Sequence, residues 1–194
     1  MRFDDGSTMR LYRQTVEDFG LFDGMELSDD VLNKLRSAAE EMSAKMRAVR
    51  IVSATNVSKK DLQNRLIAKG ENPESAENAV AWMEELNLID DKKTAELIVQ
   101  RCASKGYGVS RAKQALYEKR IPKEYWDEAL SAYPDQTDAI ISFLHSRIQE
   151  LNEPKSKKRV IDALLRKGHS YGDVRRALSQ LSLDADTFVE DFYG

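Results

Sequence analysis

The amino-acid sequence predicts an all-α fold of three tandem three-helix, helix-turn-helix-like repeats in an elongated, curved array, with a small N-terminal β-hairpin. Its composition suits helices, because 41% of the 194 residues are apolar and 32% are charged, against only nine glycines and four prolines. Apolar residues recur three and four positions apart, which is the spacing of one helix face. One pattern of paired helices occurs three times at intervals near 50 residues, which indicates a repeat protein.

Residues 1–27 are interpreted as an N-terminal extension that carries the hairpin. Asp-Asp-Gly-Ser at positions 4–7 stands between short runs that contain Phe3 and Leu11, and this composition favours a tight β-turn. The extension is also acidic, since residues 1–30 hold eight Asp and Glu against three Arg. It is the one segment for which the sequence predicts strands.

Repeat 1 is assigned to residues 28–88 and begins with a long helix. Leu-Ser-Asp-Asp at 27–30 supplies N-cap residues for this helix. Two shorter helices are expected near 59–69 and 73–87, because Gly70 favours a helix end and the Asn-Pro pair after it favours a helix start. The apolar stripe of the long helix consists of Leu32, Leu35, Ala39, Met42, Met46 and Val49.

The helix pair of repeat 1 recurs in repeat 2, residues 89–134, and in repeat 3, residues 135–194. The three copies align on Leu66, Leu116 and Leu164, which lie 50 and 48 residues apart. A three-helix unit of that size buries too little apolar surface to be stable alone and stacks on its neighbour. We therefore expect the three leucines to be buried at equivalent positions.

The first helix of repeat 2 contains two aspartates and a cysteine, which are residue types found in catalytic sites. Asp90 and Asp91 stand where a helix begins, however, and carboxylates there accept backbone N–H bonds. Cys102 shares a helix face with apolar residues and is expected to be buried rather than nucleophilic. Lys-Gly-Tyr-Gly at 105–108 is expected to end that helix in a turn.

Motifs for metals, cofactors and catalysis are missing from the sequence. It has no Gly-rich phosphate loop and no Cys-x-x-Cys, and its two histidines, His145 and His169, are far apart. We therefore expect no enzymatic activity, no cofactor and no metal. A single cysteine, with no signal peptide and no apolar run of membrane-spanning length, predicts a cytoplasmic protein without membrane contact, and we expect a monomer.

Basic side chains form the one pattern with functional potential, although a solvated surface explains such charge equally well. They are densest at 154–176, which hold eight bases against two acids. At 155–159 they open a predicted helix, where the helix dipole disfavours positive charge, so we expect a partner's anion there. The candidate partner-binding or DNA-binding residues are Lys59, Lys60, Arg111, Lys113, Lys119, Arg120, Lys155, Lys157, Lys158, Arg159, Arg166, Lys167, Arg175 and Arg176.

Residues 88–121 resemble the central region of the RecX family, the regulatory proteins of the bacterial recombinase RecA. The pattern that carries the resemblance is LIDD...A...V..R...KGYG....K..L..K.I. Residues 47–70 resemble the preceding segment of the family, and the DDG turn followed by GLFDGMELSDD resembles the N-terminal extension of RecX proteins of Gram-positive type. Two positions depart from the family pattern: Thr94 replaces an aromatic residue and Arg120 replaces a glycine.

The resemblance implies an all-helical regulator without enzymatic activity. Such a protein binds in the groove of the filament that RecA forms on single-stranded DNA. It mostly inhibits the recombinase, ATPase and coprotease activities of RecA. The processes implied are homologous recombination, DNA repair and the SOS response. The alternative from the residues is a stand-alone nucleic-acid-binding protein of helix-turn-helix-like units. The helices that would contact DNA open with PESAEN and PKEYWD, whose acids repel it. The regulator is therefore favoured, with direct contact to single- or double-stranded DNA secondary.

Overall fold

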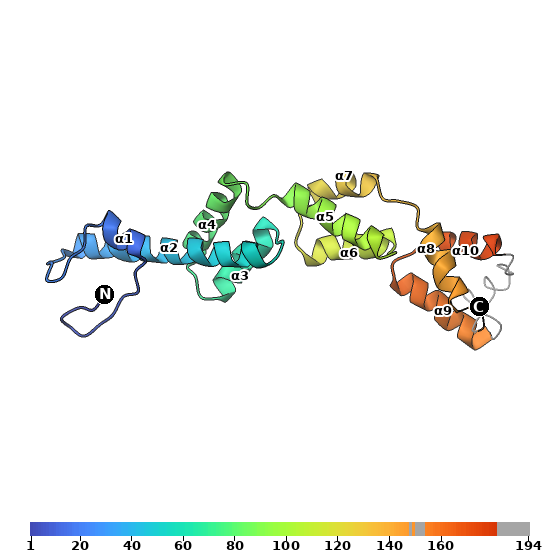
Figure 1. The fold of residues 1–194 in the computed structure, drawn as a ribbon, viewed down its shortest axis with the longest axis horizontal. Helices are drawn as coiled ribbons and strands as arrows, with labels where there is room; N and C mark the ends of the chain where they lie inside the picture. Colours follow the sequence, from blue (N-terminus) through green and yellow to red (C-terminus); the bar gives the residue numbers. More distant parts are fainter. Residues whose placement is uncertain (148, 150–153, 182–194) are drawn as a thin grey trace. The chain divides into compact units, whose positions relative to one another are not determined.

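The computed structural model describes all residues except 148, 150–153 and 182–194. The chain forms two compact units, Met1–Asp90 and Asp91–Gly194, and each is described by itself. Regular secondary structure in the described residues is helical throughout, which confirms the predicted all-α class (Figure 1). From Asp29 onward the described α-helices fall into threes, as expected for tandem three-helix repeats, whereas the elongated, curved array stays a prediction.

The predicted N-terminal β-hairpin is wrong, because no β-strand forms in the described part of the chain. Residues 1–9 instead make a turn closed by one antiparallel bridge between Arg2 and Thr8. In it the Phe3 N–H donates to the Ser7 carbonyl (2.9 Å) and the Asp5 carboxylate accepts from the Ser7 N–H (2.8 Å). Most of these residues are exposed, and two short segments without a third strand or an apolar face bury too little to extend a ladder. The short helix α1, Arg13–Asp18, follows.

Three helices of the first unit begin and end close to their predicted positions. Helix α2, Asp29–Ala54, starts after Ser28, whose hydroxyl accepts from the Val31 N–H (3.4 Å). Helix α3, Lys59–Ala68, has the equivalent serine cap, and α4, Pro73–Glu85, has an asparagine cap followed by proline. The local signals for helix starts and stops in repeat 1 are therefore confirmed.

The apolar face of α2 differs in part from the predicted stripe. Only Leu35 of that stripe is fully buried, and its other members are half-buried. The residues of α2 in the main core are Ala44 and Ala48, which pack with α3 and α4 around Leu62, Leu66 and Met83. Small side chains at the contact allow a close approach of the helices, whereas Met42 and Met46 of α2 are only half-buried.

The second unit contains repeats 2 and 3. Repeat 2 consists of α5, Asp91–Ser104, α6, Val109–Glu118, and a 3₁₀ turn, Lys123–Tyr125, that leads into α7, Trp126–Ser131. Helix α5 thus begins at Asp91, as the capping interpretation of that aspartate requires. The core of repeat 2 is Ala95, Val99, Leu116 and Ile121.

Repeat 3 consists of α8, Thr137–His145, α9, Pro154–Arg166, and α10, Tyr171–Gln180. Its core is the largest in the second unit and contains Ile140, Leu144, Val160, Ile161, Leu164, Val174, Ala177 and Leu178. Leu66, Leu116 and Leu164 are each 0% exposed and lie in the middle helix of their repeats, so their predicted burial is confirmed.

Candidate partner-binding surface

The Lys-Gly-Tyr-Gly turn at 105–108 ends α5 as predicted, and it also joins repeat 2 to repeat 3. The Gly108 N–H donates to the Lys167 carbonyl (3.0 Å), and the Ser110 N–H donates to the Gly168 carbonyl (3.2 Å). These bonds link the α5–α6 turn and the first turn of α6 to the α9–α10 turn. We call this contact, centred on Gly108 and Gly168, the glycine joint.

Glycine is required on both sides of the joint because the two backbones nearly touch. A Cβ on Gly108 would lie 2.0 Å from the Gly168 carbonyl oxygen, and a Cβ on Gly168 would lie 2.4 Å from the Arg111 nitrogen. Gly168 also has a φ of +89°, which other residues rarely adopt. The joint thus depends on the absence of two side chains.

Two side chains hold the Lys-Gly-Tyr-Gly turn from outside. The Tyr133 hydroxyl donates to the Tyr107 carbonyl (2.7 Å), and burial raises the pKa of Tyr133 to about 12. His169, only 5% exposed, places Nε2 3.0 Å from the Gly106 carbonyl, which can only accept, so this nitrogen carries the proton. Burial lowers the pKa of His169 and favours its neutral ring.

Two of the predicted binding residues lie beside the joint and have partners within the chain. The Lys167 ammonium lies 5.0 Å from the Phe143 ring and 5.9 Å from the Tyr107 ring, within cation–π range. Arg111 is half-buried, with its guanidinium 3.7 Å from the Glu118 carboxylate. Both side chains therefore contribute to packing as well as to surface charge.

Other candidates also have ionic or polar partners. In the first unit Lys59 pairs with Glu84 (2.9 Å), and Lys60 donates to Gln63 (2.9 Å). In the second, Arg176 lies 3.6 Å from Asp173. Solvent screens such pairs, which contribute little stability, so a competing anion can displace them.

Three of the candidate cations of the second unit are exposed and have no ion pair with any described residue: Lys113 on α6, and Arg159 and Arg166 on α9. Lys158 and Arg175 are exposed as well, while Lys119 and Lys157 are half-buried. The side chain of Lys155 lies outside the described residues.

The two departures from the RecX pattern occupy structural positions. Thr94 is buried in α5. Arg120 is exposed and adopts φ +55° at the end of the α6 turn, where Gly70 and Gly168 stand in the other repeats. Arg120 therefore combines a candidate binding side chain with a backbone conformation that favours glycine.

The predicted burial of Cys102 is confirmed. Its thiol is buried in α5, and burial raises its pKa, so it is a packing residue rather than an activated nucleophile. No group of three or more His, Cys, Asp or Glu residues is placed to hold a metal ion within the part of the chain that the structure describes. None of the described helices is long and apolar enough to cross a membrane.

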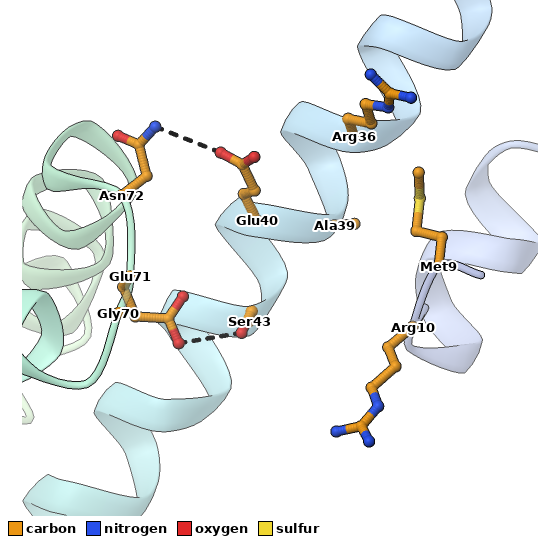
Figure 2. A pocket seen from close by; sticks show the side chains of 9 residues that line it. All are labelled: Met9, Arg10, Arg36, Ala39, Glu40, Ser43, Gly70, Glu71 and Asn72. Atoms are coloured by element: carbon orange, nitrogen blue, oxygen red, sulfur yellow. Dashed lines mark hydrogen bonds between the residues drawn. The ribbon is translucent and has the colours of Figure 1, made fainter. Parts of the chain in front are cut away.

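The structure shows two features that the sequence interpretation missed. One is the glycine joint, for which the Lys-Gly pairs at 105–106 and 167–168 were the only signal. The other is a pair of hollows in the first unit, between the N-terminal segment and α2, whose walls share Met9, Arg10 and Ser43. Figure 2 shows the smaller hollow, in which Glu71 points toward Ser43.

Comparison with known proteins gives one consistent result. The family model described as RecX, second three-helix domain, matches residues 90–130. The regulatory protein RecX of Clostridioides difficile (strain 630) is 24% identical over 184 residues, covering 92% of this chain and 86% of that protein. The protein of the same name from Chlorobaculum tepidum is 28% identical over 142 residues, covering 72% of this chain and 88% of its own.

Solved structures show the same fold. A crystal structure of regulatory protein RecX has a TM-score of 0.71 at 20% identity and covers 91% of this chain and 92% of its own. A crystal structure of RecX from Lactobacillus salivarius has a TM-score of 0.66 at 20% identity, covering 75% of this chain and 98% of its own. The sequence relatives are named as regulatory proteins, and the two solved RecX structures share this fold.

Proposed function

The chain belongs to the RecX family, and from this premise we propose that it binds RecA filaments on single-stranded DNA and mostly inhibits their recombinase, ATPase and coprotease activities. The observation that carries the proposal is the extent of the family likeness, which reaches 96% of the chain in sequence and 91% in fold. The proposed regulator acts in the cytoplasm, as a monomer, and without an enzymatic activity of its own.

The charges of the second unit support a partner of this kind. Arg111 and Arg159 lie 48 residues apart and are equivalent in repeats 2 and 3, as are Lys119 and Lys167. The glycine joint connects the two repeats within one compact unit, so cations from both can act on one partner. Repeated cations suit a partner with repeated negative charge, such as a phosphate backbone or an acidic protein groove.

The direct test is ATP hydrolysis by RecA assembled on single-stranded DNA. We expect the protein to lower the rate when present at fewer copies than RecA, because one molecule in the filament groove affects several subunits. The protein alone should hydrolyse no ATP. An unchanged rate with the protein in excess would reject the regulator and favour the nucleic-acid-binding alternative.

The binding surface is tested by reversing charge at Arg159 and Arg166, which are exposed on α9. The double variant R159E/R166E should fold like the parent and inhibit RecA about tenfold less well at low salt, since two attractive charges become repulsive. Arg101→Glu is the control, because Arg101 is exposed on α5 of the same unit and is not a candidate. If R159E/R166E inhibits RecA as well as the parent and the control do at every salt concentration, the Arg159 and Arg166 side chains are only solvated.

A further inference from the structure

The larger hollow of the first unit is lined by arginines. It has a volume of about 880 Å³ and lies between the N-terminal segment, which contributes Arg2, Arg10 and Tyr12, and α2, which contributes Ser43, Arg47 and Arg50. None of the described residues that line it is acidic. We call it the arginine hollow. None of its four arginines is among the candidates chosen from the sequence.

Positive side chains line the arginine hollow, and acidic side chains of the same segments lie outside it. Residues 1–30 hold eight acids and three arginines, yet two of the three arginines line the hollow and none of the acids does. The third, Arg13, is 93% exposed and pairs with Glu17. On α2 the lining residues are spaced four and three apart, which places them on one face of the helix. Two separate elements thus direct positive charge to the same space.

Only one of the four arginines is neutralised by a described carboxylate. The Arg47 Nε donates to Glu71 (2.5 Å), whose side chain is 7% exposed and also accepts from the Ser43 hydroxyl (3.0 Å; Figure 2). This pair fixes the Arg47 guanidinium at the wall. Arg2, Arg10 and Arg50 form no ion pair with any residue that the structure describes. Gathered like charges repel, so the hollow favours an anionic ligand.

The chemistry of the lining selects the class of anion. A guanidinium group binds a phosphate through two parallel hydrogen bonds, and the three arginines without an ion pair, spread over two elements, suit several singly charged phosphates. A nucleoside triphosphate normally needs Mg²⁺, which is held by carboxylates, and no acid is present among the described lining residues. The half-buried Tyr12 offers a ring that a base can contact.

We propose that the arginine hollow binds the phosphate backbone of a single nucleic-acid strand. The choice of ligand rests on the proposed function, in which the protein works on a filament that contains single-stranded DNA. The site itself needs no recombinase, and it adds a nucleic-acid contact on the first unit to the basic residues of the second.

The test is the binding of a labelled oligothymidylate of about 15 nucleotides to the full-length chain, measured by fluorescence anisotropy across a range of salt. In R10A/R50A we expect the Kd to rise about tenfold and the slope of log K against log salt to flatten by about 0.7 for each lost contact. R13A/R101A is the matched control: it removes the same charge from exposed positions outside the hollow and should leave both quantities unchanged. Circular dichroism checks that both variants fold.

Competition identifies the ligand. The unlabelled strand should displace the probe at a far lower phosphate concentration than ATP or inorganic phosphate, and hexaglutamate should displace it poorly. Equal competition by ATP would indicate a mononucleotide site, and equal competition by hexaglutamate would indicate an acidic-peptide site; either result overturns the proposal. So does an R10A/R50A variant that binds like its control. RecA is absent from all these measurements, so this proposal and the RecA proposal can fail separately.

Discussion

The α3–α4 turn of the first unit and the α9–α10 turn of the second have the same sequence signal, Lys-Gly, and nearly the same backbone. Gly70 and Gly168 have φ values of +88° and +89°. A Cβ on Gly70 would meet nothing within 4 Å, whereas a Cβ on Gly168 would lie 2.4 Å from the backbone of Arg111. Equivalent glycines therefore have different roles: Gly70 only permits a turn, while Gly168 also permits contact between two repeats.

Gly108 is the reverse of Gly70, because close contact and not backbone conformation requires glycine there. Its φ is −80°, a value that any residue adopts, yet a Cβ there would lie 2.0 Å from the Gly168 carbonyl. Conformation alone explains Gly70, close contact alone explains Gly108, and both explain Gly168. A glycine in a repeat motif thus indicates a structural constraint, but the sequence does not show whether that constraint is backbone conformation or close contact.

Alanine substitutions at these three glycines should give the largest effects and separate the two constraints. Gly168→Ala combines backbone strain with overpacking and should lower the free energy of unfolding by roughly 4 kcal/mol. Gly108→Ala has only the overpacking and should lower it by roughly 2 kcal/mol. Gly70→Ala has only the strain, about 1 kcal/mol. Urea unfolding followed by circular dichroism measures all three.

Equal losses at Gly70 and Gly168 would show that the joint adds nothing to stability. Amide hydrogen exchange gives a second measurement, because Gly108→Ala should speed the exchange of the backbone amides at positions 108 and 110, which the joint protects in the parent. Gly70→Ala should leave the exchange of those amides unchanged.

A smaller effect is expected at Arg120, where repeat 2 has the same left-handed backbone without glycine. Arg120→Gly relieves the backbone strain. Arg120→Ala removes the same side chain but retains the strain. We expect the glycine variant to unfold at a higher temperature than the alanine variant, with a difference in stability of about 1 kcal/mol. Indistinguishable variants would mean that the turn relaxes without glycine.

The smallest effect is a pH dependence at His169. Burial lowers the pKa of His169 in the folded chain below its unfolded value near 6.5, so the unfolded chain binds more protons between those two values. Stability from the neutral ring is complete above about pH 6.5 and declines as the pH falls toward the folded pKa, by at most about 1.4 kcal/mol per pH unit.

The groups that face His169 include Lys167, which opposes its protonation, and Asp173, which favours it. His169→Gln keeps a donor for the Gly106 carbonyl and does not titrate in this range. The parent should therefore lose stability relative to this variant between pH 7 and pH 5, in parallel thermal melts. Curves that stay parallel would show that His169 does not titrate differently on folding.

The sequence predicted the features of this fold that depend on neighbouring residues. Helix starts at Ser28, Ser58 and Asn72 follow from short-range hydrogen bonds, and the burial of the equivalent leucines follows from helical periodicity. The hairpin failed because a turn composition cannot guarantee an apolar face for the strands. The α2 stripe failed in part because alanines, whose pattern is weak, form the closest contact.

Contacts between distant segments could not be predicted in the same way. His169 and Gly106 are 63 residues apart, and the joint is formed by main-chain atoms, which leave no pattern of side chains. The arginine hollow depends on which face of α2 the N-terminal segment covers. The density of basic residues in the sequence located the candidate cations of the second unit. It could not predict which groups contact them, such as the Phe143 ring near Lys167.

The glycine joint also affects how this protein can change over evolutionary time. Amide and carbonyl groups are the same in every residue except proline, so substitutions of most neighbouring side chains leave its hydrogen bonds chemically intact. Two positions are constrained to the smallest residue, and the surfaces around them are free to acquire new charges. A connection of this kind allows binding surfaces to diverge while the repeats keep their mutual register.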